Sequence, residues 1–148
     1  MRKKVRDILV VIGWASAIML LTVRALHQWN PVSRTIGSYL DAPDLLLLLA
    51  VSVVAGIFLA DLNRILYGYI GSIALSISIA LIYSSVFDWF VIGYGEIFSQ
   101  TRFGWEYAVF YAFAKILRTM FPGVMLLTFL GGFAGGILSD TVWPHQGH

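Results

Sequence analysis

The stretch Ile65–Phe87, ILYGYIGSIALSISIALIYSSVF, contains no charged residue. A helix needs about 20 consecutive, mostly apolar residues to cross the hydrocarbon core of a bilayer. This stretch is long enough, and a helix formed from it would have no charged face that needs water. It therefore predicts a membrane-spanning helix, and the rest of the chain can be judged by whether it continues the same pattern.

Three further stretches, residues 8–26, 45–60 and 120–140, are also predominantly apolar. Hydrophobic residues make up 59% of the 148 residues, and the mean hydropathy is +0.81. The segments between these stretches are too short to hold a soluble core, so residues 1–148 are expected to form a single transmembrane domain. The fold class predicted is an all-α, polytopic integral membrane helix bundle with four clear transmembrane helices.

Residues 103–119 leave two topologies open. In the first they form a fifth crossing, which turns at Phe121–Gly123 into the last span. In the second they lie along the outer membrane interface as an amphipathic helix. The five-crossing topology places seven bases inside and three outside, whereas the four-crossing topology places five on each side. Because basic residues favour the cytoplasmic side, the sequence favours five crossings and keeps the interfacial helix as the alternative.

Four bases, Arg2, Lys3, Lys4 and Arg6, precede the first span. This cluster predicts a cytoplasmic N-terminus in the cell (plasma) membrane, with residues 27–44 and 88–103 outside. The same segment resembles a signal peptide in outline, but Arg24 is unfavourable in the only candidate cleavage site, and an uncleaved first helix is expected.

Composition excludes several functional classes. The chain has no cysteine, which removes disulfides, thiolate metal sites and a cysteine nucleophile. Charged residues are only 12% of the chain, with a net charge of +2, and they form no basic face suited to nucleic acid. Nucleic acid is therefore not an expected partner, whereas membrane lipids are.

Small residues recur every fourth position along the third span, and a second set occurs in the last span. Small residues let helix backbones approach closely in lipid, so both sets predict tight packing within the chain, against itself in a second copy, or against other membrane subunits. The alternative, a polar path lined by serines, is weaker because such hydroxyls usually bond to their own backbone. The packing residues are Gly68, Ser72, Ser76, Ala80, Ser84, Gly132 and Gly136.

Lys115 and Arg118 are the charges of greatest functional interest, since ionisable residues near membrane depth are functional candidates by default. Two interpretations compete: anchors that reach the headgroups, or a site for an anionic ligand. Asp61 could serve as their acidic partner in the five-crossing topology. Asp61 and Arg64 themselves, three residues apart, are expected to form a local ion pair at a helix end.

No catalytic motif is present, and the sequence predicts no cofactor. His145 and His148 have a spacing compatible with one metal ion, but two histidines near a chain end form a motif that arises easily by chance. The aromatic residues concentrated between Tyr83 and Phe113 suit the headgroup zone and require no quinone pocket.

Three functional hypotheses follow. The first is a small, non-catalytic accessory subunit of a larger membrane protein complex, which accounts for the minimal loops and abundant packing faces. The second is a small oligomeric channel or transporter for an ion or small solute. The third is a membrane enzyme acting on a lipid or quinone. The sequence alone does not identify a substrate, a partner or an oligomeric state.

Overall fold

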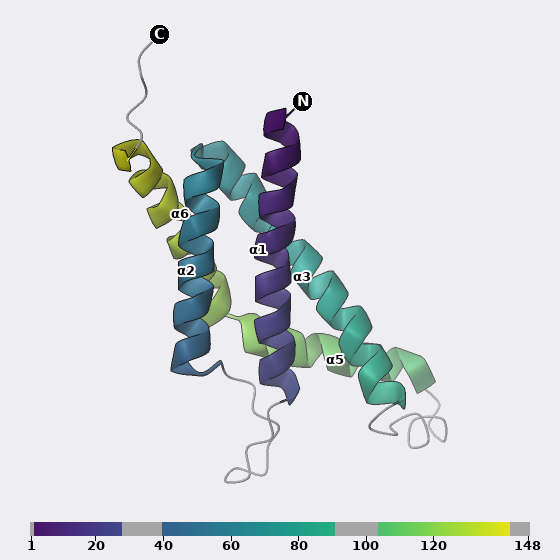
Figure 1. Cartoon of the computed structure of the whole chain (residues 1–148). Helices are drawn as coiled ribbons and strands as arrows, with labels where there is room; N and C mark the ends of the chain where they lie inside the picture. Colours follow the sequence, from purple (N-terminus) through teal and green to yellow (C-terminus); the bar gives the residue numbers. More distant parts are fainter. Residues whose placement is uncertain (1, 28–39, 91–103, 143–148) are drawn as a thin grey trace.

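The computed structural model describes residues 2–27, 40–90 and 104–142, and within these ranges every regular element is a helix. The helices are numbered as in Figure 1. They are α1 (Arg2–His27), α2 (Ala42–Leu59), α3 (Leu62–Phe90), α5 (Gly104–Met120) and α6 (Gly123–Val142). The predicted all-α architecture is therefore confirmed for the described residues.

Three of these helices, α1, α2 and α3, are each long and apolar enough to cross a membrane. The α5–α6 pair meets the same test as one bent unit, so the described residues contain three candidate spans, or four with that pair. The stretches predicted at residues 8–26 and 65–87 lie within α1 and α3, and the stretch 45–60 extends one residue beyond α2, to its left-handed C-cap Ala60.

The helices α1 and α2 stand side by side, and α3 and α6 are inclined to them (Figure 1). The chain runs down α1, up α2 and down α3, and α5 then lies across the end of the bundle where α1 finishes (Figure 1). From there α6 returns to the end at which α1 begins. The tightest pairings are α2 with α6 and α1 with α3.

The turn predicted at Phe121–Gly123 is not an antiparallel hairpin. Trp105–Met120 and Gly123–Ser139 meet at a bend of 51°, so the second helix continues from the first through an elbow and does not run back antiparallel to it. The helical hydrogen bonds reach the elbow from both sides, with Phe121 N–H donating to Leu117 and Leu126 N–H donating to Pro122. Because Pro122 has no N–H and disfavours a helical residue before it, the break is local.

The α5 helix buries a face of small and aliphatic side chains. Ala108, Ala112 and Ile116 are each at most 1% exposed, and α5 packs across α1 and α3. The opposite side exposes aromatic rings, including Phe110 at 70%. One face of α5 therefore packs on the bundle, and the opposite face is left uncovered by the chain.

Glycines allow α2 and α6 to approach until their backbones nearly touch. A Cβ placed on Gly56 would meet the Gly132 carbonyl group, with 2.9 Å to its carbon, and a Cβ on Gly135 would meet the Val53 carbonyl. A Cβ on Gly131 would lie 2.7 Å from the Cβ of Ser52. Because these neighbours are backbone or short side chains, the contact requires glycine, as expected for small-residue packing in lipid.

Candidate functional site

The hydroxyl face of α3 is closed against α1. Ser76 is fully buried, and its Oγ donates within 2.8 Å of the Ala15 carbonyl and 2.6 Å of the Ser72 carbonyl. Ser72 in turn lies 2.9 Å from the Tyr69 carbonyl. The stripe from Gly68 to Ser84 is buried at all five of its positions. The Ser72 and Ser76 hydroxyls therefore use backbone acceptors and line no open polar path.

Three further hydroxyls are buried near the C-terminal ends of α1 and α3, at the end of the bundle that α5 crosses. The Oγ atoms of Ser84 and Ser85 and the Oγ1 of Thr22 have no hydrogen-bond partner among the described residues. Sequence analysis did not single out Thr22 or Ser85, because neither belongs to a regular stripe. A hydroxyl in an apolar setting costs free energy unless it is bonded, so this region is polar beyond the needs of packing.

Trp14 is buried inside the bundle, although no motif in the sequence marks it. Its ring is 1% exposed, and its Nε1–H donates to Ser52 Oγ at 3.0 Å. A Cβ on Gly132 would lie 2.8 Å from the far edge of this ring. Tyr69 lies 6.2 Å away, centroid to centroid, and its hydroxyl donates to the Met125 carbonyl at 3.1 Å. One tryptophan thus contacts or neighbours all four long helices.

Charged residues gather where α1 begins and α2 turns into α3. Arg64 donates to Asp7 at 3.2 Å, and Arg6 lies 3.3 Å from the same carboxylate. The predicted pair between Asp61 and Arg64 has an N–O distance of 3.8 Å. Asp7 was not among the predicted residues, since its partner is 57 positions away and only the fold brings them together. The cluster ties α1 to the α2–α3 turn.

A second ion pair lies at the opposite end of the same helices. Arg24 Nη1 donates to Asp44 Oδ1 at 3.1 Å, and the Asp44 side chain is 5% exposed against 62% for Arg24. Asp44 lies in the first turn of α2, where the positive end of the helix dipole favours a carboxylate. Its second oxygen, Oδ2, is buried with no hydrogen-bond partner among the described residues.

Lys115 and Arg118 do not meet the acidic residue suggested for them. Arg118 is exposed and lines a groove of about 270 Å³ together with Leu40 and Leu45, at the start of α2. Asp61 follows the other end of α2, which at 18 residues is about 27 Å long. Arg118 and Asp61 therefore lie at opposite ends of α2, and the structure does not bring them together. Lys115 Nζ lies 5.3 Å from the centroid of the Tyr111 ring, within reach of a cation–π contact.

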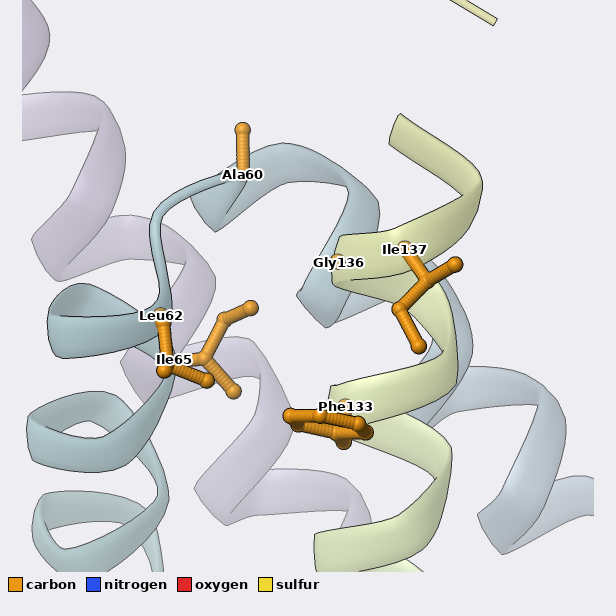
Figure 2. A pocket seen from close by; sticks show the side chains of 6 residues that line it. All are labelled: Ala60, Leu62, Ile65, Phe133, Gly136 and Ile137. Atoms are coloured by element: carbon orange, nitrogen blue, oxygen red, sulfur yellow. The ribbon is translucent and has the colours of Figure 1, made fainter. Parts of the chain in front are cut away.

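No group of three His, Asp or Glu side chains in the described part of the chain could hold a metal ion. His145 and His148 lie outside the described residues. Figure 2 shows a pocket of about 200 Å³ between α3 and α6, with Ile65 and Phe133 pointing toward one another across it. Its remaining lining, from Ala60, Leu62, Gly136 and Ile137, carries no titratable group.

No protein-family model matches this sequence, and comparison with curated proteins and with solved structures finds no significant match.

Proposed function

We propose that this chain is a non-catalytic accessory subunit of a larger membrane protein complex, built as a bundle with four crossings. The observation that carries the proposal is the closed hydroxyl face of α3. Ser72 and Ser76 on this face are buried and bonded to backbone carbonyls of α1 and α3, and Ser84 on the same face is also buried. A bundle with a closed interior of this kind leaves little room for a solute path, as expected for a structural subunit.

The two ion pairs support a membrane frame for the bundle. Asp7 and Arg24 mark the two levels on α1, and 17 residues of helix between them span about 26 Å, close to the 30 Å of a hydrocarbon core. In this frame α5 lies along the interface at the Arg24 level, which corresponds to the interfacial alternative. The bent α5–α6 pair then contributes one crossing, through α6.

The orientation proposed places the start of α1 and the end of α6 on the cytoplasmic side of the plasma membrane. The basic cluster Arg2, Lys3, Lys4 and Arg6 precedes the first span, and Arg64 lies at the same end of the bundle. Lys115 and Arg118 then act as outer-interface anchors, with long stems that carry their charges to the headgroups.

A partner subunit must use surfaces other than the small-residue faces. Gly132 is covered by Trp14, Gly136 by Ile65, and Gly68 by Leu59. The surfaces left for a partner are the exposed apolar sides, on which several large side chains are more than half exposed. They include Tyr67, Ile70, Ile82, Phe90, Phe110 and Leu130.

Purification of the tagged chain from its native membranes in mild detergent tests this function. We expect at least one other membrane polypeptide to co-purify at a fixed molar ratio, measured by quantitative mass spectrometry. Phe110→Ser and Leu130→Ser each alter an exposed side chain on a different helix, and loss of the partner in one variant alone would locate the interface. Ser78→Ala, which alters an exposed hydroxyl on α3, is the matched control.

Reconstitution of the purified chain into liposomes can contradict the accessory-subunit proposal. If the purified chain elutes alone or as a homo-oligomer and conducts ions or small solutes above empty liposomes, the channel hypothesis replaces the accessory-subunit proposal. Turnover of a bound lipid or quinone by the isolated chain would instead favour the enzyme hypothesis.

A further inference from the structure

An open apolar groove lies between α1 and α3 at the end of the bundle where α1 begins. It encloses about 330 Å³, at the lower end of the range of ligand pockets, about 300–1,000 Å³. Ile8, Val11, Ile12, Leu59, Tyr67 and Gly68 form its apolar lining, and Asp7 and Arg64 provide its charged end. The groove is therefore amphipathic, with an ionic end and an apolar body.

The body of the groove is shaped by a glycine and left uncovered by the chain. A Cβ on Gly68 would lie 2.9 Å from a side-chain carbon of Leu59 and 3.3 Å from one of Val11. The absence of a side chain at Gly68 therefore lets these two residues form the bottom of the groove. Ile8 is 58% exposed and Ile12 47%, which leaves two side chains one helical turn apart along the wall. Such a surface suits a flexible hydrocarbon chain lying along the helix axis.

At the charged end of the groove, the Arg64 guanidinium group has a nitrogen that is not used in an ion pair with Asp7 or Asp61. Arg64 uses Nη1 for Asp7 and Nε for Asp61, and Nη2 has no partner among the described residues. The arginine side chain is 44% exposed, so the guanidinium group is not enclosed by the chain. Four bases, Lys3, Lys4, Arg6 and Arg64, belong to the start of α1 and the start of α3, together with the two acids Asp7 and Asp61. The local surplus of positive charge favours an anion.

We propose that this groove binds an anionic phospholipid, with its phosphate at Arg64 and one acyl chain along Ile8 and Ile12. A phosphodiester lies at the end of a membrane span, which is the depth of Arg64 in the frame set by the two ion pairs. The guanidinium offers a planar donor to phosphate, and the apolar wall directly below accepts the chain of the same molecule. A second protein chain would have to cover the charged end and the apolar wall together.

Lipid retention by the purified chain tests the charged end. The protein is exchanged into detergent containing equimolar phosphatidylglycerol and phosphatidylcholine, and bound lipids are counted by native mass spectrometry. We expect about five-fold preference for phosphatidylglycerol, the effect of one base at an anionic headgroup. Arg64→Gln should abolish this preference, whereas Arg118→Gln, at the opposite end, should retain it. Glycerol phosphate should not displace the lipid, because it lacks the acyl chain.

A second pair of variants tests the apolar body and keeps the proposal falsifiable if Arg64→Gln fails to fold. Ile8→Trp should fill the groove and lower the number of retained lipids, whereas Ile70→Trp, on an exposed part of α3 outside the groove, should not. Thermal unfolding in detergent confirms that each variant is folded. Equal retention by both tryptophan variants, no headgroup preference in the native chain, or full displacement by glycerol phosphate would overturn the proposal.

Discussion

Trp14 and Ser52 form the hydrogen bond that joins α1 to α2 inside the bundle, with 3.0 Å between Nε1 and Oγ. Ser52 Oγ also lies 2.7 Å from the Leu48 carbonyl, one turn earlier on its own helix. The hydroxyl proton can thus be donated to the helix while the oxygen accepts from the indole. Because both residues are at most 1% exposed, water cannot replace either partner.

Ser52→Ala is expected to lower the free energy of unfolding by about 1–3 kcal/mol, the cost of leaving a buried donor unpaired. The indole N–H of Trp14 would be the orphaned group. Thermal unfolding in detergent, followed by tryptophan fluorescence, measures the change. Ser78→Ala removes a hydroxyl that also bonds one turn back, at 2.8 Å, but is exposed, and it should be nearly silent. Equal effects from both variants would contradict a special role for the Trp14 contact.

Gly56→Ala should destabilise the bundle by about 1–3 kcal/mol or more, because the new methyl group would collide with the Gly132 backbone. The obstacle is backbone, so neither helix can relieve the clash by a rotamer change. Gly13→Ala is the matched control, since a Cβ there meets nothing within 4 Å. The control should be neutral or slightly stabilising, because alanine favours helix more than glycine does. If Gly56→Ala and Gly13→Ala had the same unfolding midpoint, the close α2–α6 contact would be contradicted.

Arg24→Gln should destabilise the chain by leaving the Asp44 carboxylate buried without its partner. Breaking a fully buried pair costs about 3–5 kcal/mol, and we expect about 1–3 kcal/mol because Arg24 is 62% exposed. Asp44→Asn added to Arg24→Gln should recover part of the loss, since the unpaired charge is then removed. Stability measured for the single and double variants gives the coupling between the two residues. A double variant less stable than either single variant would argue that the pair is not electrostatically linked.

The apolar stretches were sufficient to predict the helices because a long uncharged run has few alternatives to a helix in lipid. Stretch 65–87 lies within α3, and stretch 8–26 within α1. The direction of α5 could not be predicted in this way. Its bases suggested a crossing, whereas its path depends on Ala108 and Ala112, which fit beneath it against other helices.

The ion pairs and the central tryptophan were also beyond the sequence. Asp7 meets Arg64, and Arg24 meets Asp44, only because α1, α2 and α3 pack at a particular register. A count of charges along the chain contains no information on that register. In the sequence, Trp14 cannot be distinguished from a tryptophan at the membrane surface. Its burial is explained only by the folded structure, in which it contacts Ser52 and packs against Gly132.

The number of crossings can be decided by labelling single cysteines, because the native chain has none. In the proposed topology Asp41→Cys, before α2, faces outward and should react with an impermeant thiol reagent in intact cells. Asn63→Cys, at the start of α3, and Thr141→Cys, near the end of α6, both lie inside and should react only after permeabilisation. All three native residues are exposed, so the reagent can reach each position from the side it faces.

Thr141→Cys separates the two topologies most sharply. With four crossings the end of α6 shares a side with the start of α1, as the 51° elbow between α5 and α6 requires if α5 stays at the interface. With five crossings it lies on the opposite side. Labelling of Thr141→Cys in intact cells, with Asn63→Cys still protected, would restore the fifth crossing and remove α5 from the interface. Labelling of Asn63→Cys and protection of Asp41→Cys would instead reverse the orientation of the whole bundle.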